Sequence, residues 1–226
     1  AAVVSNKTVE ENGYNIAVNC RRSEAEAEKL VQELKKIGAD ADSFKADVGS
    51  FSDVQNMYNS IKERFGTVAA LVNNAGISEQ ALLPDITDDM WDRMIDVNLK
   101  GAFNCSKTVL PDMINEKHGK IINISSVWGQ TGASMEVHYS AAKAGVIGFT
   151  KALAKEVAPS GITVNCICPG VINTDMLSSF SQNELDALRE EIPLGRIGSP
   201  EDIANTVLFL LSPGADYITG QIIGVN

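Results

Sequence analysis

Tyr139 and Lys143 are the two residues of this sequence whose types and spacing suggest acid–base chemistry. They lie four positions apart in a segment with helical periodicity, so their side chains project from one face of the expected helix. A phenol with a pKa near 10 exchanges protons poorly at neutral pH unless a nearby cation stabilises its phenolate. Lys143 could supply that cation, and Ser126 could hydrogen-bond a substrate carbonyl oxygen. Alternatively, Tyr139 and Lys143 could be an exposed pair on a surface helix, and Ser126 could cap a helix or turn.

The elements that must position these residues alternate between short apolar runs and longer helical patterns. Consecutive apolar residues such as Leu71 and Val72 indicate strands covered on both faces. Strands are expected at Ala1–Val4, Asn15–Asn19, Ser43–Asp47, Ala69–Asn73, Lys120–Ser125, Thr163–Cys168 and Gln221–Val225, and helices at Glu24–Ile37, Ser52–Phe65, Asp88–Glu116, Val137–Ala158 and Pro200–Leu211. This alternation predicts an α/β fold in a single domain over residues 1–226. We expect a doubly wound parallel sheet of about seven strands, with helices on both faces.

Small and polar residues close five of the expected strands. In a parallel sheet of this kind, ligands bind at the carboxyl ends of the strands. The positions are Arg21 to Ser23, Asp47 and Val48, Asn73 to Gly76, Ser125 and Ser126, and Pro169 and Gly170 followed by Thr174. Together they predict one ligand site at that edge of the sheet.

Composition excludes several other classes of function. The 226 residues include 29 acidic and 19 basic side chains, a net charge of −10, which disfavours nucleic acid and anionic membranes as partners. No apolar run approaches the roughly 20 residues that span a bilayer, and no signal peptide opens the sequence. The cysteines lack the paired spacing of a zinc site, so we expect free thiols, no metal and a reducing, cytoplasmic environment. They are Cys20, Cys105, Cys166 and Cys168.

Several motifs together resemble those of the short-chain dehydrogenase/reductase family, from about Gly13 to the C-terminus. They are Asn73-Asn74-Ala75-Gly76, Asn98 within residues 96–99, Ser126, Tyr139 with Lys143, and Pro169-Gly170. Residues 139–149, 161–165 and 217–220 are most similar to the 3-oxoacyl-[acyl-carrier-protein] reductases. The resemblance implies an NAD(P)-dependent enzyme that reduces a 3-oxoacyl thioester to the 3-hydroxyacyl product in fatty-acid biosynthesis. The alternatives are an oxidoreductase acting on another ketone or alcohol, and a binding protein that has lost its cofactor.

The resemblance also assigns roles to individual residues. Tyr139 would be the general acid, Lys143 would lower its pKa and hold the nicotinamide ribose, and Ser126 would polarise the carbonyl. Asn98 would keep a water in a proton relay; it could also be a structural amide that kinks its helix, and both could hold. The remaining cofactor contacts would come from Asn74, Ala75 and Gly76 through their backbone, Asp47 and Val48 at the adenine, Pro169 and Gly170, and Ile172 and Thr174 at the nicotinamide amide.

The residues after the second strand indicate which cofactor is used. An acidic residue there would bind the ribose hydroxyls and repel a 2′-phosphate, but no carboxylate occurs in residues 19–23. Arg21 could instead pair with the phosphate through a charge-assisted contact. We therefore expect NADPH in preference to NADH, unless the arginines are simply solvated at the start of a helix.

The family's glycine-rich motif, T-G-x3-G-x-G, does not follow the first strand. Residues 5–12 contain no glycine, and the sequence stops at Asn226, where relatives continue with paired glycines and a short tail. Either a loop carrying the motif is missing near residues 4–5, or the deletion is genuine and the chain cannot hold a dinucleotide. We favour the first interpretation because every later catalytic element is intact.

The surface around the expected site bears on substrate and assembly. Relatives dock an acidic carrier protein on a basic patch, for which Lys117 and Lys120 are candidates, although Ser160 stands where a basic residue is frequent. Trp128 and Met135 would flank the opening and favour an apolar substrate chain, or they simply pack within loops. The small and apolar faces of the helices predicted over 88–116 and 137–158 suggest a homotetramer, as in relatives.

Overall fold

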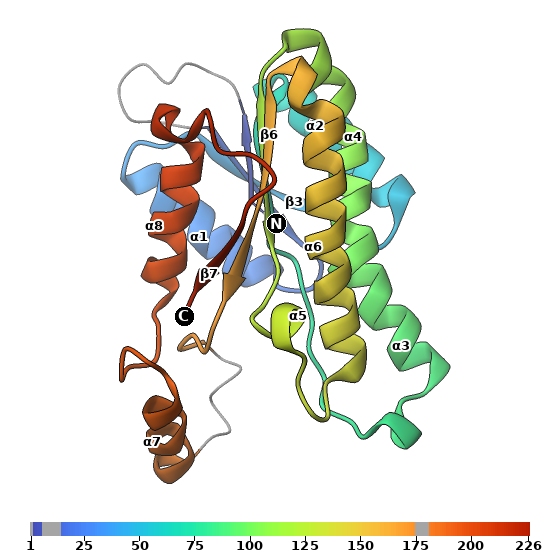
Figure 1. The fold of residues 1–226 in the computed structure, drawn as a ribbon. Helices are drawn as coiled ribbons and strands as arrows, with labels where there is room; N and C mark the ends of the chain where they lie inside the picture. The colour runs from blue at the N-terminus through green and yellow to red at the C-terminus, as the bar shows by residue number, and fades with distance from the viewer. Residues whose placement is uncertain (1, 6–14, 175–180) are drawn as a thin grey trace.

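One sheet of seven strands organises residues 2–5, 15–174 and 181–226, which the computed structural model describes (Figure 1). In space the strands follow the order β3-β2-β1-β4-β5-β6-β7. Their bounds are β1 Ala2–Ser5, β2 Asn15–Cys20, β3 Ala41–Lys45, β4 Val68–Asn73, β5 Gly119–Ile124, β6 Ile162–Pro169 and β7 Ile222–Val225. The predicted α/β class is confirmed, with all seven expected strands present within one or two residues of their predicted positions.

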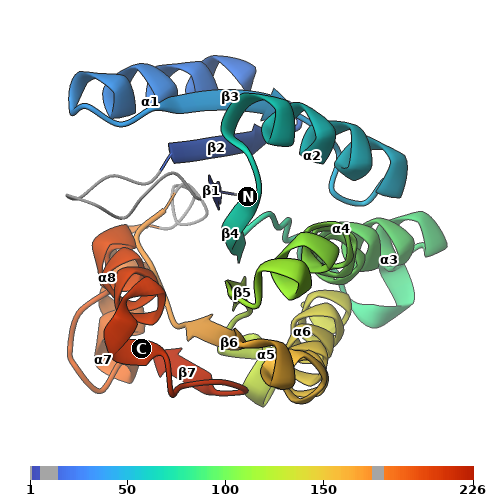
Figure 2. The same cartoon turned by 90° about the horizontal axis from the view of Figure 1, so that it is seen from above.

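Helices cover both faces of the sheet, as Figures 1 and 2 show. One face carries α1 (Glu24–Lys36) and α8 (Pro200–Leu211), and the other carries α2 (Phe51–Phe65), α4 (Gly101–Glu116) and α6 (Val137–Val157). The shorter helices are α3 (Asp88–Ile95), α5 (Trp128–Thr131) and α7 (Gln182–Glu191). This double layer buries the central strands, and every residue of β4 and β5 is buried.

The first strand departs from the predicted parallel sheet. β1 pairs antiparallel with both neighbours, Val3 lying opposite Ala17 of β2 and Leu71 of β4, whereas the other four pairs of strands are parallel. The connection explains the reversal, because the segment 6–14 is shorter than the roughly dozen residues of a parallel crossover. The carboxyl end of β1 therefore lies at the opposite edge of the sheet from those of β2, β4 and β5. Segment 6–14, where the glycine-rich motif is expected, lies outside the described residues.

Polar caps fix where several helices begin. The Ser50 hydroxyl, rather than that of Ser52, accepts a hydrogen bond from the Asp53 N–H at the start of α2. α8 begins at Pro200, as predicted, and the Asp202 carboxylate accepts from the Ser199 N–H at 2.7 Å. Such side chains satisfy N–H groups that the first helical turn leaves unpaired.

A wide turn interrupts what the periodicity predicts as one helix over Asp88–Glu116. The π-helical turn Asp96–Lys100 separates α3 from α4. Asn98 is buried in this turn, and its amide nitrogen donates to the carbonyls of Ile77 at 2.9 Å and Met94 at 3.1 Å. Its Oδ1 also accepts from the Ile77 N–H at 3.2 Å. The side chain thus joins the loop after β4 to the helix, which supports the structural alternative for Asn98.

The core consists of apolar layers on either side of the sheet. The larger one includes Leu71, Ile121 and Val164 from three strands with residues of α2, α4 and α6, and a second lies between the strands and α8. All four cysteines are free thiols, as predicted, and only Cys20 is not fully buried. Among the described residues, we find no helix with the length and hydrophobicity needed to cross a bilayer.

Candidate active site

Ser126, Tyr139 and Lys143 converge at the carboxyl edge of the sheet. Ser126 follows β5, whereas the other two lie in the first two turns of α6. The Lys143 Nζ lies 5.6 Å from the centre of the Tyr139 ring, and the Ser126 side chain lies close enough to the phenol to lower its pKa. The spacing that suggested a shared helical face therefore brings the three groups together.

Lys143 is held by backbone groups on both sides. Its Nζ donates to the Ile124 carbonyl at the end of β5 at 3.0 Å, while its own carbonyl accepts from the Ser125 hydroxyl at 2.8 Å. Gly129 of α5 packs closely against it, since a Cβ at that position would lie 2.8 Å from the Lys143 carbonyl carbon. The ammonium group is fixed in place by these contacts, and no carboxylate pairs with it among the described residues.

Burial dominates the protonation behaviour of both helix residues. It lowers the pKa of Lys143 to about 8, although the sulfur atoms of Cys166 and Cys168 act in the opposite direction. Burial also raises the pKa of Tyr139 above its ordinary value, the hydrogen bond with Ser126 opposes this, and Glu136 adds to it. In the protein alone, the phenol is therefore a protonated donor at neutral pH, rather than the acidified group that the Tyr–Lys spacing suggests.

The loop after β4 passes close to this group of residues. A Cβ on Gly76 would lie 2.8 Å from Asn98 Oδ1 and 3.4 Å from Lys143 Nζ, so a larger residue would displace the Asn98 side chain and would touch the ammonium. Asn74 and Gly76 are exposed, and Ala75 is half-buried against the core. The three residues therefore present open backbone beside the lysine.

A ladder of buried polar side chains lies beneath the site. The Asn73 amide nitrogen donates to Asn123 Oδ1 at 2.8 Å, and the Asn123 amide nitrogen donates to the Thr150 hydroxyl at 2.9 Å. Asn73 also donates to the Ser106 hydroxyl at 3.1 Å. The ladder ties β4 and β5 to α4 and α6, the elements that carry the site.

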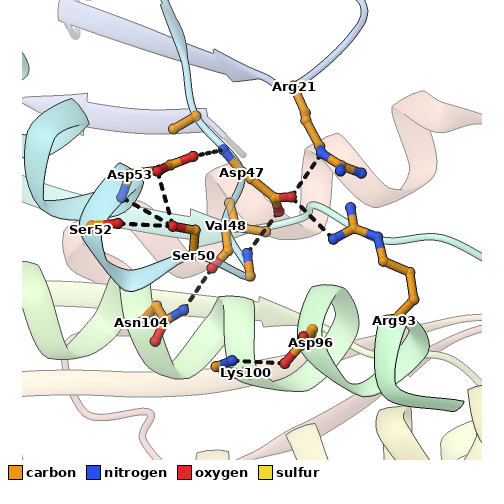
Figure 3. A network of polar contacts seen from close by, with 12 residues as sticks. Arg21, Asp47, Val48, Ser50, Ser52, Asp53, Arg93, Asp96, Lys100 and Asn104 are labelled. Carbon is orange, nitrogen blue, oxygen red and sulfur yellow. Dashed lines mark hydrogen bonds and ion pairs between the residues drawn. The ribbon is translucent and has the colours of Figure 1, made fainter. Parts of the chain in front are cut away.

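Three charged side chains meet at the other end of the same edge (Figure 3). Asp47 Oδ2 lies 2.8 Å from Arg21 Nε and 3.1 Å from Arg93 Nη1, and its Oδ1 accepts from the Gly49 N–H at 3.0 Å. Burial raises the pKa of Asp47, but the Gly49 N–H and the guanidinium groups of Arg93 and Arg21 outweigh it and hold the pKa below its usual value. We name Arg21, Asp47 and Arg93 the arginine clamp. It links the ends of β2 and β3 to α3.

Val48 follows the clamp but turns its side chain inward. The side chain is buried, and a Cβ on Gly101 of α4 would lie 2.7 Å from its Cγ2. Its carbonyl accepts from the Asn104 amide at 2.8 Å. Contact of Val48 with an adenine ring stays a prediction.

The loop after β6 borders a cavity of about 550 Å³. Gly170, Ile172 and Trp128 line it, together with residues of α7, α8 and β7. Pro169 ends β6, and exposed Thr174 donates its hydroxyl to the Ile172 carbonyl at 3.4 Å. These predicted cofactor residues lie together beyond the carboxyl end of β6, and Trp128 lines the same cavity.

Lys117 and Lys120 do not form the predicted docking patch. Both precede or begin β5, so they lie at its amino end, opposite Ser126. Lys120 is buried, and its Nζ binds the Ser212 carbonyl at 2.7 Å and the Asp216 carboxylate at 2.5 Å. The lysine caps the end of α8, because a buried ammonium needs such partners.

The described residues fit the two ends of an NAD(P) molecule. Open backbone at Gly76 lies beside Lys143, and the guanidinium groups of the clamp offer donors to an anionic group. A pyrophosphate is normally held by the glycine turn and helix that follow the first strand. The part of the chain described here supplies neither at this edge, because β1 runs in the opposite direction.

Sequence reasoning missed Arg93 and the Asn73–Asn123–Thr150 ladder. An asparagine inside each of two apolar strands is the signal that could have identified the ladder, because a buried amide needs a partner. Arg93 lies five residues before Asn98 and shows no comparable signal, since its position opposite Asp47 depends on the tertiary packing of α3.

Comparison with known proteins adds independent evidence. A family model described as "Enoyl-(Acyl carrier protein) reductase" matches residues 3–226. Proteins named 3-oxoacyl-[acyl-carrier-protein] reductase FabG from Staphylococcus epidermidis and Staphylococcus aureus are 46% identical over 216 residues, covering 96% of this chain and 88% of each relative. A 3-oxoacyl-[acyl-carrier-protein] reductase from Synechocystis is 41% identical, covering 95% of this chain and 86% of its own.

Proposed function

Because the chain belongs to the short-chain dehydrogenase/reductase family, whose members use NAD(P), we propose that it reduces a 3-oxoacyl thioester with NADPH. The product is the 3-hydroxyacyl thioester of fatty-acid biosynthesis. The observation that carries this proposal is the convergence of Ser126, Tyr139 and Lys143 beside the open backbone of Gly76. The names of the relatives support the 3-oxoacyl substrate in particular.

The three side chains suit the reduction of a ketone. The bound nicotinamide would supply a hydride to the carbonyl carbon. Tyr139, protonated at neutral pH, donates its proton to the carbonyl oxygen as negative charge develops there. Ser126 orients the same oxygen by hydrogen bonding. Lys143 stabilises the phenolate that remains, because its ammonium lies close to the ring and stays mostly charged below a pKa of about 8.

The remaining assignments concern cofactor contacts and the proton relay. We propose that Asn74, Ala75 and Gly76 contact the cofactor by backbone, and that Pro169, Gly170, Ile172 and Thr174 surround the nicotinamide. Asn98 anchors the loop that carries Gly76, and we propose that it also keeps the relay water. Asp47 and Val48 form the adenine end.

The preference for NADPH rests on Arg21. Arg21 uses Nε to bind Asp47. Its two Nη groups have no partner among the described residues, so they could bind a 2′-phosphate. Glu24, the first carboxylate after β2, instead pairs with Lys45 at 2.5 Å. We further propose a cytoplasmic homotetramer that reduces the acyl chain while this remains attached to acyl carrier protein.

Turnover with a small thioester tests the proposed function. The full chain should oxidise NADPH in the presence of acetoacetyl-CoA, and should do so faster than with NADH. Simple ketones with NADPH, and secondary alcohols with NADP+, serve as competing substrates. Turnover of those alone would favour the alternative oxidoreductase, and no turnover of any of them would contradict the proposal.

One observation favours a second candidate, a binding protein without redox activity. The reversed β1 places no helix of the described residues where a pyrophosphate would be held. Titration with NADPH, followed by nicotinamide fluorescence, separates the candidates. Saturable enhancement supports the reductase, and an unchanged signal at millimolar NADPH supports the binding protein.

A further inference from the structure

The arginine clamp contains a residue with no role in the proposed function, Arg93. Its guanidinium, one-third exposed, binds the same oxygen of Asp47 that Arg21 binds. Arg93 comes from α3, whereas the other two residues follow strands, so three elements meet on one carboxylate oxygen (Figure 3). We propose that Arg93 is a positioning residue for cofactor specificity, which holds Asp47 so that Arg21 can read a 2′-phosphate. This inference rests on the proposed NADPH preference.

The contact with Asp47 fixes the orientation of the Arg21 guanidinium. Arg21 contacts Asp47 through its Nε. The donors of a guanidinium group lie in one rigid plane. Fixing one edge of the group therefore orients the other, which can bind a phosphate in a bidentate manner. Asp47 can fix Arg21 only if the carboxylate is itself held, and the Gly49 N–H and Arg93 do this from two other directions.

The net charge of the clamp also favours binding of a phosphate. Arg21 and Asp47 alone sum to zero, so a dianionic phosphate approaching Arg21 would also meet an adjacent carboxylate. Arg93 makes the clamp positive by one charge in a chain that carries −10 overall. Asp53 lies on the other side of Asp47 in Figure 3, where its carboxylate binds the Asp47 main-chain N–H and the Ser50 hydroxyl.

Two of the neighbouring cations are paired with other carboxylates. Lys45 pairs with Glu24 at 2.5 Å, and Lys100 pairs with Asp96 at 2.9 Å. Lys100 is drawn in the same view as the clamp and forms an ordinary exposed ion pair. It therefore provides a matched control for removing one positive charge nearby without touching Asp47.

Binding of a cofactor fragment tests the inference without requiring turnover or a pyrophosphate site. NMR titrations of the full chain with adenosine 2′-monophosphate and with adenosine give two dissociation constants. Their ratio measures the contribution of the 2′-phosphate to binding. Arg93→Met should weaken the nucleotide about tenfold, or ~1.4 kcal/mol, with adenosine unchanged. Arg93→Lys should recover part of the loss, and Lys100→Met should behave as the wild type.

A double variant shows whether Arg93 acts through Arg21. Arg21→Met should abolish the preference for adenosine 2′-monophosphate over adenosine. Adding Arg93→Met to that variant should not weaken binding of the nucleotide further. The Asp47 carboxyl pKa, measured by carbon NMR, should rise in Arg93→Met. Should Arg93→Met not fold, Arg93→Gln takes its place.

The outcomes separate this inference from the proposed function. Wild-type affinity in Arg93→Met, with discrimination lost in Arg21→Met, overturns the role of Arg93 and leaves the NADPH preference standing. A wild-type chain that binds both probes equally overturns the NADPH preference and, with it, the role of Arg93.

Discussion

Two basic groups at the same edge of the sheet, Lys143 and Arg21, are held in contrasting ways. Lys143 is buried and bonds to a backbone carbonyl, so burial brings its pKa down to about 8. Arg21 is 42% exposed and shares a carboxylate oxygen with a second arginine. Burial makes the lysine a group that titrates close to physiological pH, whereas the clamp presents a fixed charge. The first arrangement suits proton chemistry and the second suits recognition of an anion.

Removing the buried cation should have the largest effect. In Lys143→Met, the phenolate left by proton donation loses its nearest cation, so the rate of NADPH oxidation with acetoacetyl-CoA should fall about 100-fold or more. Arg21→Met, the counterpart at the clamp, should raise KM for NADPH and spare kcat. A Lys143→Met rate within threefold of wild type would show that Lys143 is not needed for the proton transfer, and would remove the contrast with Arg21.

The same substitution should stabilise the fold, because a charged lysine is costly to bury. Below pH 8 the ammonium is charged in both the folded and unfolded states, and the folded state bears the penalty, up to ~3 kcal/mol. Between pH 8 and 10.5 the unfolded chain binds more protons, so wild-type stability rises with pH relative to the variant. Urea unfolding at pH 7, 9 and 10.5 should show the advantage of Lys143→Met shrinking toward zero. A pH-independent difference between the two proteins would refute this reading of the buried lysine.

The ladder beneath the catalytic edge should matter more than exposed amides. Asn123→Ala removes one buried hydrogen-bond partner from Asn73 and one from Thr150, which should cost about 1–3 kcal/mol of unfolding free energy. Asn56→Ala, on the exposed surface of α2, is the control and should change little. Equal effects in chemical denaturation would mean that the ladder does not support the site.

Reversing the charge at the clamp should have a smaller, selective effect. Arg21→Asp places a carboxylate beside Asp47, where it would accept from ribose hydroxyls and repel a phosphate. The ratio of kcat/KM for NADPH to that for NADH should fall about tenfold or more, with kcat for the better cofactor within a few-fold of wild type. An unchanged ratio would remove Arg21 from cofactor choice.

The contrast between the two regions extends to what could be predicted from sequence. Spacing along one helix brought Tyr139 and Lys143 together correctly, because helical geometry is local. Strand ends correctly placed Ser126, Asp47 and Gly76 at one edge, because parallel strands share a direction. The predicted direction of β1 was wrong, because the direction of this strand depends on the length of its connection to β2.

Other errors came from interactions between distant segments. The π-helical turn at Asn98 depends on a hydrogen bond to Ile77, and periodicity does not contain that contact. Lys120 was wrongly predicted to lie on the surface, because a lysine at the start of a strand is usually exposed, whereas here its ammonium binds a carbonyl at the end of α8. Arg93 joins a carboxylate 46 positions away, a contact that only the folded chain reveals.

The central claim is that the Tyr139 hydroxyl delivers the proton in the reduction, and one measurement tests it directly. Single-turnover consumption of NADPH with acetoacetyl-CoA should be compared between wild type and Tyr139→Phe, with nicotinamide fluorescence confirming that both proteins bind the cofactor. The phenylalanine variant should bind NADPH and keep the wild-type unfolding midpoint within a few degrees, yet consume cofactor about 1,000-fold more slowly. Consumption at the wild-type rate in that variant would contradict the claim.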